Sequence, residues 1–222
     1  MFARYSSYVL LFNFIYHYYD FFLWYLGDQQ IQIEHAYYKG IYAFTSALVF
    51  IVYIHVLFFP KNNLNAPNIP SFPPLIMLFS LNFGLLIGVY NLYFIQLYKL
   101  PAFLNHLRSI EIGLIFILLS FILIYFSAKS FNNYQEDPNP TTKSNVLITS
   151  GIFKYSRNPM YLALTLFQFG VGASLSFIHV CLMSFVTIVL LHYFVVKKEE
   201  QYLTNRFGNS YTTYLDNTSR WL

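Results

Sequence analysis

Long apolar runs are the feature that most limits what this chain can fold into. A helix needs about 20 apolar residues to cross the hydrocarbon core of a bilayer, and runs of that order recur along the whole sequence. Only 10% of the 222 residues are charged, against about 25% in soluble domains. The chain is therefore predicted to be an all-α, polytopic integral membrane protein. The first four predicted spans are Tyr5–Leu26, Tyr42–Phe59, Leu75–Leu97 and Ile110–Phe126.

The last apolar run, Pro159–Val196, has 38 residues, which is too long for a single span. Its middle part, Gly170–Ser176, consists mainly of small, turn-prone residues. Small residues also let neighbouring helices approach closely in lipid. We therefore expect this run to form a hairpin of two tightly packed helices, which brings the total to about six transmembrane helices.

The tail that begins at Lys197 has a different pattern. Its apolar residues recur at intervals of three and four, which is typical of an amphipathic helix lying at the membrane interface with its apolar side down. We expect this helix to break near Gly208, with Tyr211 and Tyr214 as interfacial anchors. The chain then divides into N-terminal transmembrane helices, 1–127, and a C-terminal region, 128–222, that contains the polar loop, the hairpin and the tail.

Lys and Arg residues are distributed unequally across this topology. Six spans place ten of the 13 basic residues on the side that holds both termini and the polar loop. Because cytoplasmic segments carry the excess of Lys and Arg, both termini and the loop are predicted to be cytoplasmic. The first apolar run is predicted to be retained as a membrane span rather than removed as a signal peptide. Together with the short loops, this suits a protein of a bacterial inner membrane. No basic run indicates a nucleic-acid partner. Membrane lipids are the expected surroundings, and the oligomeric state stays open.

The stretch SGIFKYSRNPMYLALT, which begins at position 150, joins the polar loop to the hairpin. Pro159 can begin a helix, because the first helical position has no use for an N–H group. Arg157 and Asn158 then fall where this helix enters the membrane. The hairpin returns the chain to the same face, where Glu200 follows soon after its last apolar residue. We therefore expect Arg157 and Glu200 to meet across the mouth of the hairpin.

Two motifs in this region resemble a known family. LITSGIFKYSRNPMYLAL, followed by EEQYLTNRFGNSYTTY and a closing RWL, is similar to the isoprenylcysteine carboxyl methyltransferase and phospholipid methyltransferase superfamily. The resemblance covers roughly 140–222. Asn158 stands where the family often has His, and Ala163 where Gly is frequent. Asn217 stands where many members carry an Arg, and Arg220 follows three residues later.

The resemblance implies a membrane methyltransferase that uses S-adenosylmethionine and methylates a lipidic or amphipathic acceptor, with 128–222 as the cofactor-binding region. The chemistry is sound: an arginine can clamp a carboxylate, glycine permits close backbone approach, aromatic rings attract a sulfonium, and no metal is required. The predicted catalytic residues are Arg157, Asn158 and Arg220. The predicted cofactor ligands are Ser150, Gly151, Tyr155, Arg157, Asn158, Tyr161, Glu199 and Glu200.

Other interpretations of the same residues stay open. Arg157 could simply anchor a helix end, Asn158 could equally cap the helix that Pro159 opens, and the two glutamates could be solvated charges. Sterol reductases have a similar Arg-x-Pro-x-Tyr element but bind NADPH, and a non-catalytic membrane protein could keep the same fold. The sequence leaves open whether the acceptor is a carboxylate, an amine or a thiol.

Overall fold

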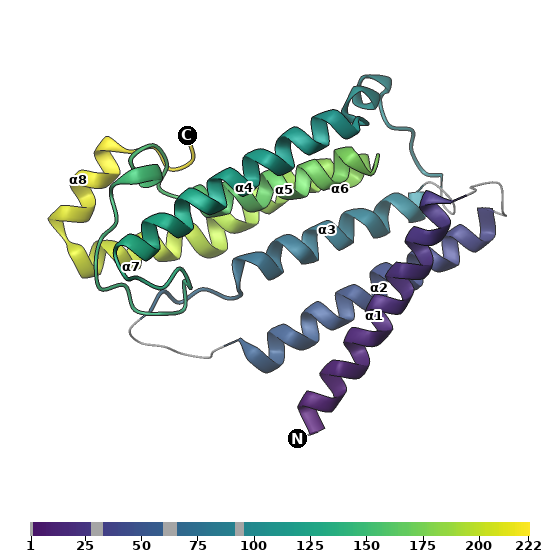
Figure 1. Ribbon diagram of the computed structural model, residues 1–222, viewed down its shortest axis with the longest axis horizontal. Coiled ribbons are helices and arrows are strands. Elements are labelled where there is room, and N and C mark those ends of the chain that lie inside the picture. Colours follow the sequence, from purple (N-terminus) through teal and green to yellow (C-terminus); the bar gives the residue numbers. More distant parts are fainter. Residues whose placement is uncertain (1, 28–32, 60–65, 92–95) are drawn as a thin grey trace.

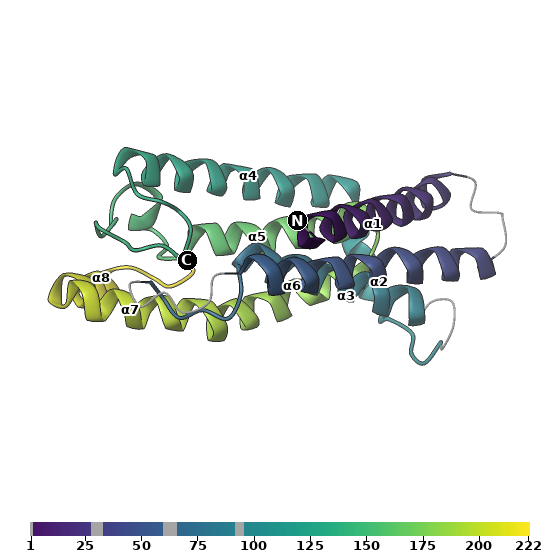
Figure 2. The same ribbon diagram turned by 90° about the horizontal axis from the view of Figure 1, so that it is seen from below.

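The computed structural model describes residues 2–27, 33–59, 66–91 and 96–222, which form helices and, within these ranges, no strand. Most of the longer helices run roughly along the length of the molecule (Figures 1 and 2). The short C-terminal helices, the loop that follows the helix Ile110–Asn133 and the C-terminus gather at one end (Figure 1). The predicted all-α fold is confirmed. The helices are α1 (Phe2–Leu26), α2 (Ile33–Phe58), α3 (Pro73–Val89), α4 (Ile110–Asn133), α5 (Pro159–Ser174), α6 (Ile178–Leu191), α7 (Lys197–Phe207) and α8 (Asn209–Asn217).

The polytopic membrane class is also supported by the structure. Three of the described helices are long and apolar enough to cross a membrane, and α3 is a shorter apolar helix. Large apolar side chains cover the outside of the bundle, where Phe12, Leu118 and Phe185 are each at least 60% exposed. Such an outer surface suits lipid rather than water. The three helices are Tyr38–Phe58, Ile110–Asn133 and Ile178–Phe207.

The helix boundaries differ from the predicted ones in informative ways. α2 begins before the predicted Tyr42, and α3 ends before the predicted Leu97; residues 92–95 lie outside the described part. α4 continues seven residues past Phe126, because the hydroxyls of Ser127 and Ser130 donate to carbonyls four residues earlier and stay within the helix. The predicted division at 127/128 therefore falls inside α4.

The predicted hairpin is confirmed, and its two helices are in close contact: a Cβ atom added at Gly172 of α5 would lie 2.7 Å from the backbone nitrogen of Cys181 on α6. Its turn lies between Ser174 and Ile178, next to the predicted small-residue segment. α5 packs along α4 with almost no space between the backbones near Gly113 and Gly170. A Cβ atom added at Gly113 would lie 2.6 Å from the Gly170 carbonyl oxygen. Small residues thus bring these two helices together, as expected for helices in lipid.

The second helix of the hairpin does not end at the membrane. α6 continues through a π-helical turn, His192–Val196, directly into α7, and the continuous helix Ile178–Phe207 has 30 residues. At 1.5 Å per residue it is about 45 Å long, longer than the ~30 Å hydrocarbon core. α7 is therefore the polar extension of a membrane helix, which projects beyond the bilayer. The predicted break at Gly208 is confirmed, with φ at +55°.

The N-terminal helices pack on the hairpin through an apolar core and a polar network. The core joins α1, α2 and α3 to α6 through Phe21, Phe44, Leu85 and Val180 together with smaller neighbours. In the network, the Thr187 hydroxyl of α6 donates a hydrogen bond to Gln168 Oε1 on α5 over 2.6 Å. The same hydroxyl lies 2.8 Å from the Ser80 hydroxyl on α3. Asp20, the acid of the first predicted span, forms an ion pair with Lys39. These contacts fix the helices that support the hairpin.

Candidate functional site

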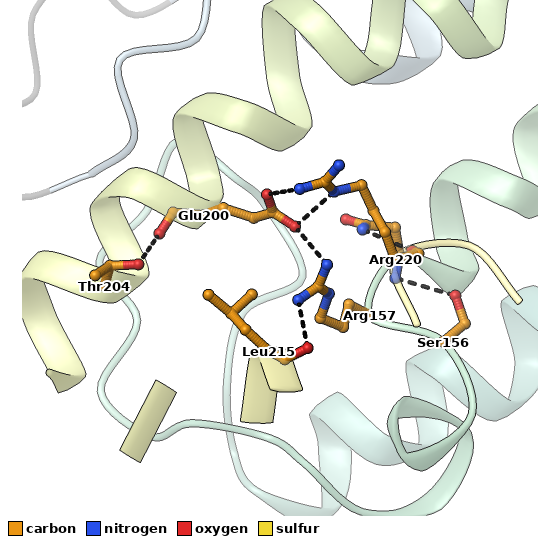
Figure 3. A network of polar contacts seen from close by, with 7 residues as sticks. Ser156, Arg157, Glu200, Thr204, Leu215 and Arg220 are labelled. Atoms are coloured by element: carbon orange, nitrogen blue, oxygen red, sulfur yellow. Dashed lines mark hydrogen bonds and ion pairs between the residues drawn. The ribbon is translucent and has the colours of Figure 1, made fainter. Parts of the chain in front are cut away.

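Three segments that are far apart in the sequence meet at the mouth of the hairpin. The first is the turn before α5, the second is α7, and the third is the tail after α8 (Figure 3). Pro159 occupies the start of α5 as predicted. The Arg157 N–H donates to the Ser219 carbonyl over 3.0 Å, and the Asn158 amide nitrogen donates to the Arg220 carbonyl over 3.0 Å. The tail is therefore fastened across the turn.

This geometry excludes one of the two interpretations of Asn158. The residue is at the N-cap position of α5, but its side chain makes no capping hydrogen bond there. Its amide instead binds the tail, and its Oδ1 has no hydrogen-bond partner among the described residues. Asn158 therefore does not act as a capping side chain.

Glu200 joins two arginines from different segments (Figure 3). Arg220 binds its carboxylate through two parallel contacts, Nε to Oε1 over 2.9 Å and Nη2 to Oε2 over 2.8 Å. Arg157 approaches the same carboxylate, Nη2 to Oε1, at 3.2 Å, and its Nη1 donates to the Leu215 carbonyl over 3.2 Å. The predicted meeting of Arg157 and Glu200 is confirmed.

The cluster of Arg157, Glu200 and Arg220 carries one more positive charge than negative. The side chains of Arg157 and Glu200 are only 10% and 14% exposed. The Nε atom of Arg157 is buried and has no partner in the part of the chain that the structure describes. Unpaired buried donors are costly and rare in folded proteins, and the excess positive charge of this cluster fits an anionic ligand. Arg157 therefore belongs to an ion-paired cluster, and its role in binding a ligand stays a prediction.

A cavity of about 690 Å³ opens beside this cluster. One part of its wall is polar and includes Arg157, Asn158, Glu199 and Glu200. Another part is apolar and is built from the membrane helices, with Ile54 of α2, Leu75 of α3, Ile124 of α4 and Leu164 of α5. The cavity therefore joins a charged region beyond the membrane to an apolar region within the bundle.

Glu199 lies in the same cavity and has a different environment from Glu200. The Tyr161 hydroxyl donates to Glu199 Oε1 over 2.5 Å. Burial raises the pKa of the Glu199 carboxyl to about 7, while the hydrogen bond from Tyr161 lowers it and the charge of Glu200 raises it. A carboxyl of this kind changes its protonation near neutral pH. Glu199 is therefore not a freely solvated charge.

The predicted site residues fall into two groups. Arg157, Asn158, Tyr161, Glu199 and Glu200 line the cavity, and Arg220 reaches it through Glu200. The other three predicted cofactor ligands are outside the cavity wall, and their role as ligands stays a prediction. Ser150 contacts the Tyr134 hydroxyl, Gly151 forms a tight turn with φ at +64° beside Ser130, and the Tyr155 side chain is 67% exposed.

The expected interfacial anchors Tyr211 and Tyr214 are instead buried, at 2% and 8% exposure. The Tyr214 hydroxyl donates to the Phe153 carbonyl over 2.5 Å, and both rings line the cavity. α8 thus turns its aromatic face toward the turn before α5. The apolar spacing in the sequence identified this face but could not say whether lipid or protein would cover it.

The loop after α4 also contributes to the cavity, through residues that the sequence did not single out as a site. The Glu136 carboxylate accepts the backbone N–H groups of Asn145 and Val146, and the Tyr202 hydroxyl accepts the N–H of Ser144. Glu136, Asp137 and Tyr202 line the cavity. Because these contacts reach backbone groups, no side-chain motif signals them.

Comparison with known families agrees with this geometry. Residues 109–210 match the sequence model of the phospholipid methyltransferase family. No curated protein and no solved structure matches the chain. The matched segment begins just before α4 and ends within α8, so it contains the loop, the hairpin and α7 with both glutamates. Residues 109–210 therefore form a membrane-embedded domain of the phospholipid methyltransferase family, within the superfamily that the two motifs resemble.

Proposed function

We propose that this protein is an integral membrane methyltransferase that uses S-adenosylmethionine and transfers its methyl group to a lipidic or amphipathic acceptor. The observation that carries the proposal is the cavity, which joins the positively charged cluster around Arg157 to an apolar wall formed by membrane helices. It belongs to a segment that matches a phospholipid methyltransferase family.

The residues of the cavity fit the groups of S-adenosylmethionine. Arg157 lines the cavity, and the net positive charge of its cluster suits the carboxylate of the cofactor. The free Oδ1 of Asn158 can accept a hydrogen bond from an ammonium or a hydroxyl group. Both carboxylate oxygens of Glu200 are engaged by arginines, which favours a role in holding Arg157 rather than in direct contact with the cofactor.

S-adenosylmethionine, when bound, supplies a methyl group on a sulfonium that a nucleophile can displace in line. The contribution of the protein is then mainly alignment. Holding two reactants in line can contribute roughly 7–11 kcal/mol to lowering the barrier. The hydrogen bonds at this site are consistent with that role, since they join the turn before α5 to α8 and to the segment after α8, and Glu200 of α7 binds Arg220.

Binding of the two possible cofactors separates this proposal from its alternatives. Purified protein titrated with S-adenosylmethionine and, separately, with NADPH should bind the first and not the second. Binding of NADPH alone would favour a reductase. Binding of neither, by protein whose helical content is intact, would favour a non-catalytic membrane protein.

The apolar wall of the cavity predicts that acceptors arrive from the bilayer. Each CH₂ buried in lipid contributes about 0.8 kcal/mol, so apparent affinity should rise with the chain length of the acceptor. The turnover number should change little, because the tail contributes equally to the ground state and the transition state. A chain-length series measured in bilayers with radiolabelled S-adenosylmethionine tests this. Equal efficiency for short, water-soluble acceptors would contradict delivery from the membrane.

The basic residues predict that the site faces the cytoplasm, where S-adenosylmethionine is made available. Reporter fusions after Leu222 and at Asn68 should therefore report a cytoplasmic position. A fusion in the link between α3 and α4, at Lys99–His106, should report the opposite side. A Leu222 fusion on the outside would put the cluster of Arg157, Glu200 and Arg220 on the wrong face and contradict the proposed use of the cofactor.

A further inference from the structure

The first two helices lie side by side at the edge of the bundle (Figure 1). The ring of Phe14 on α1 stacks on the ring of Phe50 on α2 at a centroid distance of 5.7 Å, and Asp20 forms an ion pair with Lys39. The two helices are therefore antiparallel. Because α2 contains the candidate membrane span Tyr38–Phe58, Phe14 lies near the middle of the bilayer and Asp20 lies near one of its surfaces.

The outward side of α1 carries a stripe of residues at intervals of four and three, which places them along one face of the helix. The members of this α1 stripe are Val9, Asn13, Tyr16, Asp20 and Leu23. Three of the five carry polar groups, and Tyr16 is 65% exposed. α1 is also not among the described helices that are apolar enough to cross a membrane by composition. The stripe is therefore more polar than a surface that faces lipid.

Asn13 is the most informative member of the α1 stripe. It directly precedes Phe14, so it lies in the middle of the bilayer, and it is exposed on the outside of the bundle. Its carboxamide has no hydrogen-bond partner among the described residues. The buried Asn82 of α3 differs, since it donates to the Leu78 carbonyl and accepts from the Tyr18 hydroxyl. An unpaired amide in hydrocarbon is strongly unfavourable, so Asn13 requires a partner from outside this chain.

We propose that the α1 stripe is the interface of a homodimer, in which Asn13 exchanges hydrogen bonds with Asn13 of the partner subunit. This inference goes beyond the proposed methyltransferase function and does not depend on it. The stripe shares no residue with the lining of the cavity, so each copy keeps its own site.

The membrane itself favours a second copy as the partner. Copies of one chain are inserted in the same orientation, so a two-fold axis that relates them lies along the membrane normal. The two α1 helices are then parallel, and each residue of the stripe faces its own counterpart at the same depth. A different protein would have to present a polar group at the depth of Asn13, whereas a second copy always does.

The chemistry of the stripe suits pairing with itself. A carboxamide carries both donors and an acceptor, so two asparagines can satisfy each other. Asparagine, serine and threonine side chains hydrogen-bond across helices in membranes. Intervals of four and three are the spacing at which two parallel helices pack with a left-handed crossing. The α1 stripe therefore combines a packing seam with one self-complementary polar pair.

The charges at the end of the stripe are compatible with this pairing. The side chains of Asp20 and Lys39 are 36% and 31% exposed, and the dimer brings both ion pairs to one depth. A lysine ammonium has three donors, so each Lys39 can serve the carboxylates of both copies. Partly exposed ionisable groups in membrane helices usually face protein rather than lipid.

Dilution in lipid tests the dimer. Full-length protein with one fluorophore after Leu222 is placed in phosphatidylcholine vesicles at decreasing protein-to-lipid ratios, and single-molecule photobleaching counts the copies. The unaltered protein should show a monomer–dimer equilibrium. Asn13→Leu should raise its dissociation constant about 3- to 30-fold, the range for interhelical hydrogen bonds in membranes. Asn13→Gln keeps the carboxamide and should stay closer to the unaltered protein than Asn13→Leu.

Cysteine cross-linking tests the geometry. A Cys181→Ala background removes the one native cysteine. In this background Tyr16→Cys should form a covalent dimer when membranes are treated with an oxidant, because each residue of the stripe faces its counterpart. Leu118→Cys, at an exposed position on the outside of α4, is the matched control and should stay monomeric.

A protein that is monomeric at every protein-to-lipid ratio would overturn the inference. An unchanged dissociation constant in Asn13→Leu protein of unaltered helical content would overturn the role of Asn13. Cross-linking of Tyr16→Cys to a different membrane protein, and not to itself, would assign the stripe to another partner and would also overturn the proposal.

Discussion

Arg157→Ala is expected to weaken S-adenosylmethionine binding by about 10- to 150-fold. The guanidinium supplies a charge-assisted contact worth roughly 1.5–3 kcal/mol, and the alanine cannot replace it. The loss is specific because Arg157 lines the cavity, its side chain is only 10% exposed, and its cluster carries an excess positive charge. Equilibrium binding to purified protein in detergent or nanodiscs measures the change.

Two variants control this experiment. Lys154→Ala removes an exposed positive charge from the same turn and should leave the affinity unchanged. Arg157→Lys keeps the charge but loses the planar guanidinium that can bind a carboxylate through two parallel hydrogen bonds. Its affinity for S-adenosylmethionine should therefore lie between that of the unaltered protein and that of Arg157→Ala. Unaltered affinity in correctly folded Arg157→Ala protein would remove Arg157 from the proposed cofactor site.

Gly113→Ala is expected to destabilise the protein by about 1–3 kcal/mol, the cost of overpacking a well-packed contact. The added Cβ would lie 2.0 Å from Ser174 Oγ, 2.5 Å from Ser174 N and 2.6 Å from Gly170 O. Two of these are backbone atoms, so relief requires α4 and α5 to separate. Unfolding in mixed micelles, followed by circular dichroism as denaturing detergent is added, measures the loss.

Ser120→Ala is the matched control on the same face of α4. Ser120 is fully buried, and its hydroxyl oxygen has no partner among the described residues. Removing an unpaired buried hydroxyl should be neutral or slightly stabilising. If Gly113→Ala and Ser120→Ala behave alike, close backbone contact between α4 and α5 is not what holds the hairpin against the rest of the bundle.

The features that the sequence predicted correctly depend on local patterns. The length of the apolar runs predicted a polytopic helical membrane protein, because a bilayer requires long apolar helices. The small residues of Gly170–Ser176 predicted the hairpin, Pro159 predicted the start of α5, and Gly208 predicted the break after α7. The meeting of Arg157 and Glu200 followed from the hairpin, since two helices joined by a short turn must return the chain to the same face.

Boundaries and surfaces were less predictable because they depend on neighbouring segments. α4 extends into what looks like a polar loop, since Ser127 and Ser130 satisfy their hydroxyls within the helix. The periodicity of the tail identified the apolar face of α8, but it did not tell whether lipid or protein would cover that face. The structure packs Tyr211 and Tyr214 against the turn before α5 rather than against lipid.

The sequence by itself therefore determined the membrane class, the hairpin and the residue types of the site. Only the tertiary structure decided how the tail completes that site. α8 and the tail after it are held by donors of Arg157 and Asn158 that bind the carbonyls of Leu215, Ser219 and Arg220. Every residue has a backbone carbonyl, so no side-chain pattern marks these acceptors. Their positions depend on folding α5, α7 and α8 around one cavity, which is also what separates Glu199 from the arginines that neutralise Glu200.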